Sequence, residues 1–156
     1  MYDRILIPLD GSPVAEGILP FAGQIAGPLD SEVVLLLVLE PIPSSAALAG
    51  GLVDADALLL RERQARQYLE RISAGLEAKG VRVKTEVRPG PAAPTIVATA
   101  VEREADLIAM TTHGRSGLGR LLFGSVAERV LRTSPVPVLL MRMTAAERSE
   151  SETARA

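Results

Sequence analysis

The stretch Thr111–Val130, TTHGRSGLGRLLFGSVAERV, decides which kind of fold this chain adopts. It follows the short apolar run Leu107–Met110, which is typical of a buried strand, and its first half is a loop rich in glycine. Ser125 and Glu128 then have the Ser-x-x-Glu spacing of a capping box, which predicts that Ser125 is the N-cap of a helix. A strand, a glycine-rich loop and a helix N-terminus bring free backbone N–H groups and the positive end of a helix dipole to one point. The stretch therefore predicts a site for a phosphate-bearing ligand.

Three common loop motifs do not fit this stretch. A Walker A loop requires a lysine and a hydroxyl residue after its second glycine, but Gly119 is followed by arginine and leucine. The dinucleotide fingerprint G-x-G-x-x-G would begin at Gly117 and finds Leu122 in place of its third glycine. A nucleophile elbow beginning at Gly114 would need a glycine at position 118, which is a leucine.

The loop instead resembles the nucleotide loop of the universal stress protein family, whose pattern is G-x-x-G, nine residues, and then G-[ST]. Gly114, the nine residues after it and Gly124-Ser125 match this pattern, while Thr111 stands where the family has its first glycine. The segment DLIAMTTHGRSGLGRLLFGSVAERVLRTSPVPVLLM is similar to the C-terminal half of the family's domain, and YDRILIPLDGSPVAE to its opening. The resemblance covers roughly residues 2–142. It implies a regulatory protein of the stress response that binds ATP, with Mg²⁺ held mainly by the phosphates and little or no turnover.

The resemblance also implies a set of ligand contacts. The adenine and ribose are expected near the end of the first strand, the base edge at the backbone of Val38, and the phosphates at the loop glycines. The expected residues are Pro8, Leu9, Asp10, Val38, Met110, Thr111, Gly114, Arg115, Gly117, Gly124, Ser125 and Val126.

Several of these residues have a second interpretation that the sequence leaves open. Asp10 can serve the turn at Gly11-Ser12 alone, and Arg115 can be a solvated loop arginine. The branched side chain of Thr111 can cost a backbone contact to the ribose, clash with the ligand and abolish binding, or bond the ribose through its hydroxyl. A nucleotide-free dimeric scaffold of the same family, acting through an unidentified protein partner, is therefore the alternative function. Hydrolysis by a Ser125–His113–Asp10 triad is disfavoured, because a capping serine is a poor nucleophile.

Composition bounds the class of protein. The chain has 156 residues, of which 47% are hydrophobic, and a mean hydropathy of +0.24, which suits one well-packed domain. We expect a nucleotide-binding domain over residues 1–143 and a disordered tail over residues 144–156. No apolar run is long enough to span a membrane and no signal-peptide pattern is seen, so we expect a cytoplasmic protein without a membrane partner. The net charge of −2 and 3% aromatic residues argue against nucleic acid, and the absence of cysteine excludes disulfides and thiolate metal sites.

Strand and helix patterns alternate along the chain, which predicts an α/β fold with a doubly wound, five-stranded parallel sheet and helices on both faces (Rossmann-like). The family resemblance supplies the strand order 3-2-1-4-5, and the ligand is then expected at the carboxyl ends of strands 1 and 4. The strands are predicted over residues 4–10, 32–39, 81–88, 107–110 and 136–141, and the helices over 13–26, 56–79, 94–104 and from 125. Residues 41–56 read as a long surface loop, or as a lid over the ligand.

Finer expectations concern the helices. Pro20 should bend the first helix, and Gly80 should end the second. That second helix should bury an apolar stripe that begins at Leu58, and Val101 should pack in the helix over residues 94–104.

The last strand, Val136–Met141, carries Pro135 and Pro137 at its start, which is typical of a sheet edge. We expect the N–H groups of Leu139 and Met141 to point away from the sheet. An apolar edge with unused donors favours pairing with a second copy, and members of the family dimerise through this strand. The sequence therefore predicts a homodimer through Val136–Met141.

Overall fold

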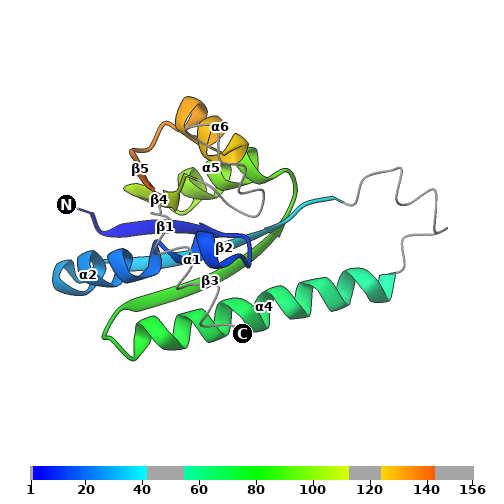
Figure 1. The fold of residues 1–156 in the computed structure, drawn as a ribbon, viewed down its shortest axis with the longest axis horizontal. Helices are drawn as coiled ribbons and strands as arrows, with labels where there is room; N and C mark the ends of the chain where they lie inside the picture. The colour runs from blue at the N-terminus through cyan, green and yellow to red at the C-terminus, as the bar shows by residue number, and fades with distance from the viewer. Residues whose placement is uncertain (1, 42–54, 113–123, 143–156) are drawn as a thin grey trace.

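The computed structural model describes residues 2–41, 55–112 and 124–142, which form a sheet with helices on both sides (Figure 1). In chain order the elements are β1 (Arg4–Leu9), α1 (Pro13–Glu16), α2 (Leu19–Leu29), β2 (Glu32–Leu39), α4 (Ala55–Glu77), β3 (Arg82–Pro89), α5 (Ala92–Glu102), β4 (Leu107–Thr111), α6 (Ser125–Thr133) and β5 (Val138–Met141). The five strands are parallel and lie in the order β3-β2-β1-β4-β5. The predicted fold class and strand order are confirmed. The predicted tail and most of the predicted loop 41–56 lie outside the described residues.

The sheet separates two hydrophobic cores. Along β1, Ile5 and Ile7 face α1, α2 and α4, while Leu6 faces α5 and α6. All three side chains are at most 2% exposed, because both faces of this central strand are covered by helices (Figure 1). The near-continuous apolar sequence of β1 follows from that double burial.

The first predicted helix is wrong as a single bent element, because the chain forms α1 and α2 with a break between them. α1 begins at Pro13, where the predicted helix begins, and Ser12 is its N-cap because its side chain accepts a hydrogen bond from the N–H of Ala15 at 3.2 Å. The break lies at Gly17-Ile18. Pro20 therefore falls in the first turn of α2, where its missing N–H costs no helical hydrogen bond.

The end of α4 matches the prediction at Gly80, which has φ +82°. The N–H of Val81 donates to the carbonyl of Leu76, and the N–H of Gly80 to that of Glu77, the bonding pattern of a Schellman motif. Two burial predictions are wrong. Leu58 is 45% exposed because the buried stripe of α4 begins at Ala65, and Val101 is 53% exposed because α5 turns Ile96 and Ala100 inward instead.

The two edges of the sheet differ in chemistry. β3 carries Arg82, Lys84, Glu86 and Arg88 at alternate positions, whereas β5 reads VLLM. Charges along an edge discourage pairing with another strand, and an apolar edge lacks that protection. Of the two, β5 is the edge suited to a second copy.

The predicted polarity of β5 is wrong. The carbonyls of Pro137 and Met141 accept hydrogen bonds from Ile108 and Thr112, both at 2.9 Å, so the backbone groups of odd-numbered residues face the sheet. The N–H groups of Leu139 and Met141 thus point inward, and those of Val138 and Leu140 point outward. The ladder also begins at Val138 rather than at residue 136, which leaves both prolines before it.

Candidate functional site

The candidate site lies at the carboxyl ends of β1 and β4, where the strand order reverses. β1 has β2 on one side and β4 on the other. The chain leaving β1 enters α1 on one face of the sheet, and the helix that follows β4, α6, packs on the opposite face (Figure 1). A crevice that can hold a ligand forms at such a switch point in open parallel sheets.

The end of β1 is a tight turn built around Asp10. The Asp10 Oδ1 atom accepts a hydrogen bond from the N–H of Ser12 at 2.9 Å, and Gly11 has φ +80°. Asp10 therefore has the turn-forming role that was its second interpretation. Pro8 and Leu9 are buried just before it, so the three expected residues are consecutive at the carboxyl end of β1, and only Asp10 is partly exposed there.

The end of β4 is buried. Met110 is 8% exposed, and Thr111 and Thr112 are each 4% exposed. Ala109 belongs to the core beneath α1 and α2 and Met110 to the core beneath α5 and α6, so strand alternation places the Thr111 side chain on the α1 face. The branched side chain at the family's glycine position is thus accommodated inside the protein.

Thr112 connects three parts of the site. Its N–H donates to the carbonyl of Met141 at the end of β5, and its carbonyl accepts from the N–H of Gly124. The hydrogen bond from Gly124 to Thr112 therefore joins the two ends of the predicted glycine loop beside β4. The loop residues expected to contact the ligand, Gly114, Arg115 and Gly117, lie outside the described residues, as does His113.

The predicted capping role of Ser125 is wrong. Gly124 is the N-cap of α6, with φ −69° and ψ 154°, and Ser125 is the exposed first residue of the helix. The helix begins one residue early, which moves Glu128 out of the capping-box position, and its carboxylate pairs with Arg132 at 3.1 Å instead. Among the described residues, no side chain caps the first turn of α6. Val126, half-buried, packs against the core beneath α5 and α6.

The end of β2 extends the site sideways from β1. Leu37 lies opposite Leu9, so Val38 and Asp10 follow at the same level of the sheet. Glu40 is the first residue after β2, and its carbonyl accepts a hydrogen bond from Arg61 Nη2 at 3.1 Å. Sequence reasoning assigned no role to Glu40. The sequence does contain one indication of a role for Glu40. It is the first charged residue after the apolar run of β2, at the edge of the sheet where the ligand is expected.

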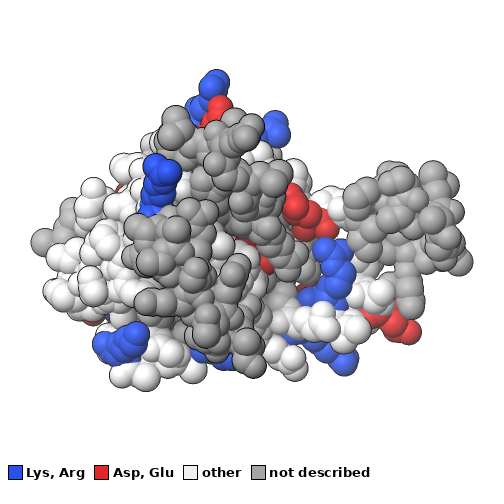
Figure 2. Space-filling model, in the orientation of Figure 1, with Lys and Arg blue, Asp and Glu red and all other residues white. Residues whose placement is uncertain are grey.

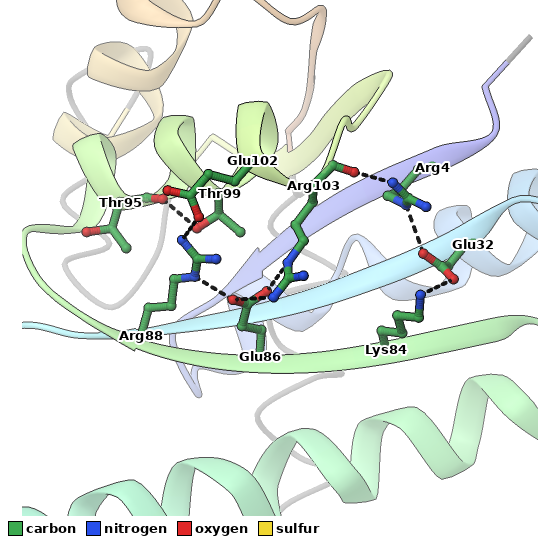
Figure 3. A network of polar contacts seen from close by, with 9 residues as sticks. All are labelled: Arg4, Glu32, Lys84, Glu86, Arg88, Thr95, Thr99, Glu102 and Arg103. Carbon is green, nitrogen blue, oxygen red and sulfur yellow. Dashed lines mark hydrogen bonds and ion pairs between the residues drawn. The ribbon is translucent and has the colours of Figure 1, made fainter.

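A separate cluster of charged side chains covers the α5 side of β2 and β3 (Figure 3). Glu86 accepts hydrogen bonds from Arg88 and Arg103, while Glu32 meets Arg4 and Lys84 at 2.8 and 2.9 Å. Hydrogen bonding from Arg103 lowers the pKa of Glu86, and hydrogen bonding from Lys84 lowers that of Glu32. Each carboxylate is matched to arginine or lysine, so we interpret the cluster as stabilising the fold.

Other chemistry finds little support in the described part of the chain. Within residues 2–41, 55–112 and 124–142 no three histidine, cysteine or acidic side chains gather as a metal site would require. Nor does any helix in those ranges have the length and apolarity to cross a membrane. On the face seen in Figure 2, the blue side chains are scattered, some of them beside red ones, and do not form one basic field.

Comparison with known proteins gives a consistent result. The model of the universal stress protein family matches residues 1–142. The chain is 37% identical to universal stress protein MJ0531 of Methanocaldococcus jannaschii over 142 residues, covering 91% of this chain and 83% of that protein. It also resembles the solved structure of MJ0577, with a TM-score of 0.79, 29% identity, and coverage of 93% of this chain and 99% of the other. A universal stress protein solved in complex with cAMP has the same fold, with a TM-score of 0.64, 24% identity, and coverage of 92% and 98%.

Proposed function

Because the chain belongs to the universal stress protein family, we propose that it is a cytoplasmic regulatory protein of the stress response that binds ATP. The ATP lies at the carboxyl ends of β1 and β4 and carries Mg²⁺ on its phosphates. Binding, with little or no turnover, is the regulatory event.

The observation that carries this proposal is the first turn of α6. Its N-cap is Gly124, which has no side chain to offer the helix, and the described residues supply no capping side chain in its place. The first N–H groups of a helix need acceptors, and a phosphate at the positive end of the dipole can provide them. A nucleotide placed here has its phosphates at α6 and its ribose near Asp10.

The position of Thr111 favours binding over the nucleotide-free alternative. Its side chain is buried on the α1 face, so a methyl group projecting into the ribose space is not expected. In this proposal the clash is therefore avoided, and Thr111 is a tolerated substitution.

Gly124→Val tests the placement of the phosphates. The φ of Gly124 is one that valine adopts easily, so the substitution fills the phosphate space without straining the backbone. We expect Mg-ATP binding to be lost in Gly124→Val and retained in Gly75→Val, a control on α4 where an added Cβ meets nothing within 4 Å. Unchanged affinity in Gly124→Val would rule out this phosphate site.

We also propose a homodimer through β5. This edge is apolar, and the N–H groups of Val138 and Leu140 point outward along it, ready to pair with a second copy. A dimeric scaffold without nucleotide would share this interface, so the dimer alone does not distinguish the two functions. A measurement of nucleotide binding distinguishes them.

A further inference from the structure

Glu40 stands at the base end of the proposed nucleotide cleft. It is the residue that follows β2, two positions beyond Val38, whose backbone is expected to meet the base edge. Residues two apart in an extended chain point to the same face, and Val38 packs on the α5 side. The Glu40 carboxylate lies on that side too, because its Oε1 meets the N–H of Ala92 in α5.

Glu40 is contacted from both faces of the sheet. Its carbonyl accepts from Arg61 of α4 at 3.1 Å, and its Oε1 accepts from the Ala92 N–H over a long 3.4 Å. The N–H of Gly90 donates to the carbonyl of Leu39 at 3.1 Å, which ties the same end of β2 to the turn after β3. α4 and α5 lie on opposite sides of the sheet (Figure 1), so the backbone at Glu40 is held between them.

The carboxylate has capacity left for a ligand. Glu40 is exposed, and within the described residues only the Ala92 N–H meets its side chain, through one oxygen. An ionised carboxylate only accepts hydrogen bonds and has about four acceptor positions on its two oxygens. Oε2 is therefore an acceptor that a ligand can reach at the edge where the base is placed.

We propose that Glu40 accepts a hydrogen bond from the exocyclic amino group of the nucleobase and so selects a 6-aminopurine over a 6-oxopurine. This inference rests on the proposed nucleotide site. The amino group of adenine donates to a carboxylate, whereas the 6-oxygen of hypoxanthine is an acceptor and faces the same carboxylate oxygen with repulsion. Glu40 is therefore a specificity residue, and its hydrogen bond from Ala92 of α5 orients the carboxylate toward the base.

Glu40→Gln tests the inference by calorimetric titration with Mg-ATP and with Mg-ITP. Glutamine keeps an oxygen for the Ala92 N–H and adds an amide N–H that can donate to the 6-oxygen. We expect the wild-type protein to prefer ATP by on the order of tenfold or more, and Glu40→Gln to lose most of that preference. Glu70→Gln, which removes an exposed carboxylate on α4, away from the end of β2, should keep the wild-type ratio.

The ratio of affinities separates this role from helix capping, since a weakened α5 would lower the affinity for both nucleotides alike. Wild-type protein that binds ATP and ITP equally, or a Glu40→Gln variant with the wild-type ratio, would overturn the role of Glu40 and leave the ATP site standing. Wild-type protein that binds neither nucleotide would overturn the proposed function itself.

Discussion

Replacing Glu86 with glutamine should destabilise the protein at neutral pH. The Glu86 side chain is 17% exposed and receives hydrogen bonds from Arg88 Nε at 2.5 Å and from Arg103 Nε and Nη2 at 2.9 and 3.0 Å (Figure 3). Glutamine is nearly the same size but carries no charge and can accept through one oxygen only. Both guanidinium groups then lose a charged acceptor.

The size of the effect follows from how exposed each partner is. The Arg103 side chain is 51% exposed, so water replaces most of what it loses, while Arg88 is 22% exposed and keeps Glu102 at 2.5 Å. Hydrogen bonds to charged groups contribute about 1.5–3 kcal/mol each when shielded from water. The bond from Arg88 is shielded from water, and the two bonds from Arg103 are weakened by it. We therefore expect Glu86→Gln to lower the free energy of unfolding by about 2 kcal/mol.

Urea unfolding followed by circular dichroism measures this cost, and its pH dependence gives a second check. The folded-state pKa of Glu86 is lowered below its ordinary value of 4.5 by the hydrogen bonds from Arg103. The stabilisation is therefore complete above the unfolded-state pKa and is lost as the pH falls through the folded-state pKa. The gap between wild type and Glu86→Gln should be full at pH 7 and should close in acid.

Glu62→Gln is the matched control. Glu62 pairs with Arg66 at 2.6 Å along α4, but the two side chains are 43% and 58% exposed, and such a surface pair contributes about 0.3–0.5 kcal/mol. If Glu86→Gln costs no more than Glu62→Gln, or if its cost persists unchanged in acid, the stabilising role of the cluster is refuted.

Two further predictions concern backbone geometry. Gly80→Ala should lower the free energy of unfolding by about 1 kcal/mol, because alanine does not readily adopt φ +82°. Gly75→Ala, within α4 and with open space for the added Cβ, should raise it by about 0.5–1 kcal/mol. Thermal unfolding measures both changes, and changes of the same sign would contradict the assigned cap. In β5, Leu140→Pro removes an outward N–H and should yield folded monomers in sedimentation velocity, while Leu139→Pro removes an inward one and should cost on the order of 1–2 kcal/mol of stability. A dimeric Leu140→Pro would place the interface elsewhere.

The sequence predicted most of the fold because its signals were local and redundant. β1 is apolar throughout, Ser12-Pro13 fixes a helix start and Gly80 a helix end, and each element agrees with its neighbours in the chain. The strand order came from family resemblance. Nothing in the spacing of the strands alone would have selected it.

The errors arose where tertiary contacts decide between local alternatives. Starting α6 at either Gly124 or Ser125 is compatible with the local sequence, and the bond from Gly124 to Thr112 at the end of β4 accompanies the earlier start. Which backbone N–H groups of β5 point toward β4 depends on the register between the two strands, and the sequence of β5 alone does not reveal that register. The bond between Arg61 and Glu40 joins residues 21 positions apart in sequence, and no motif marks it.

The most direct test of the central claim is a calorimetric titration of the purified chain, stripped of bound nucleotide, with Mg-ATP. The proposed site predicts micromolar binding, on the order of −8 kcal/mol, with about one ATP per chain. Heat that does not differ from the buffer control up to millimolar ATP would contradict nucleotide binding and would favour the dimeric scaffold.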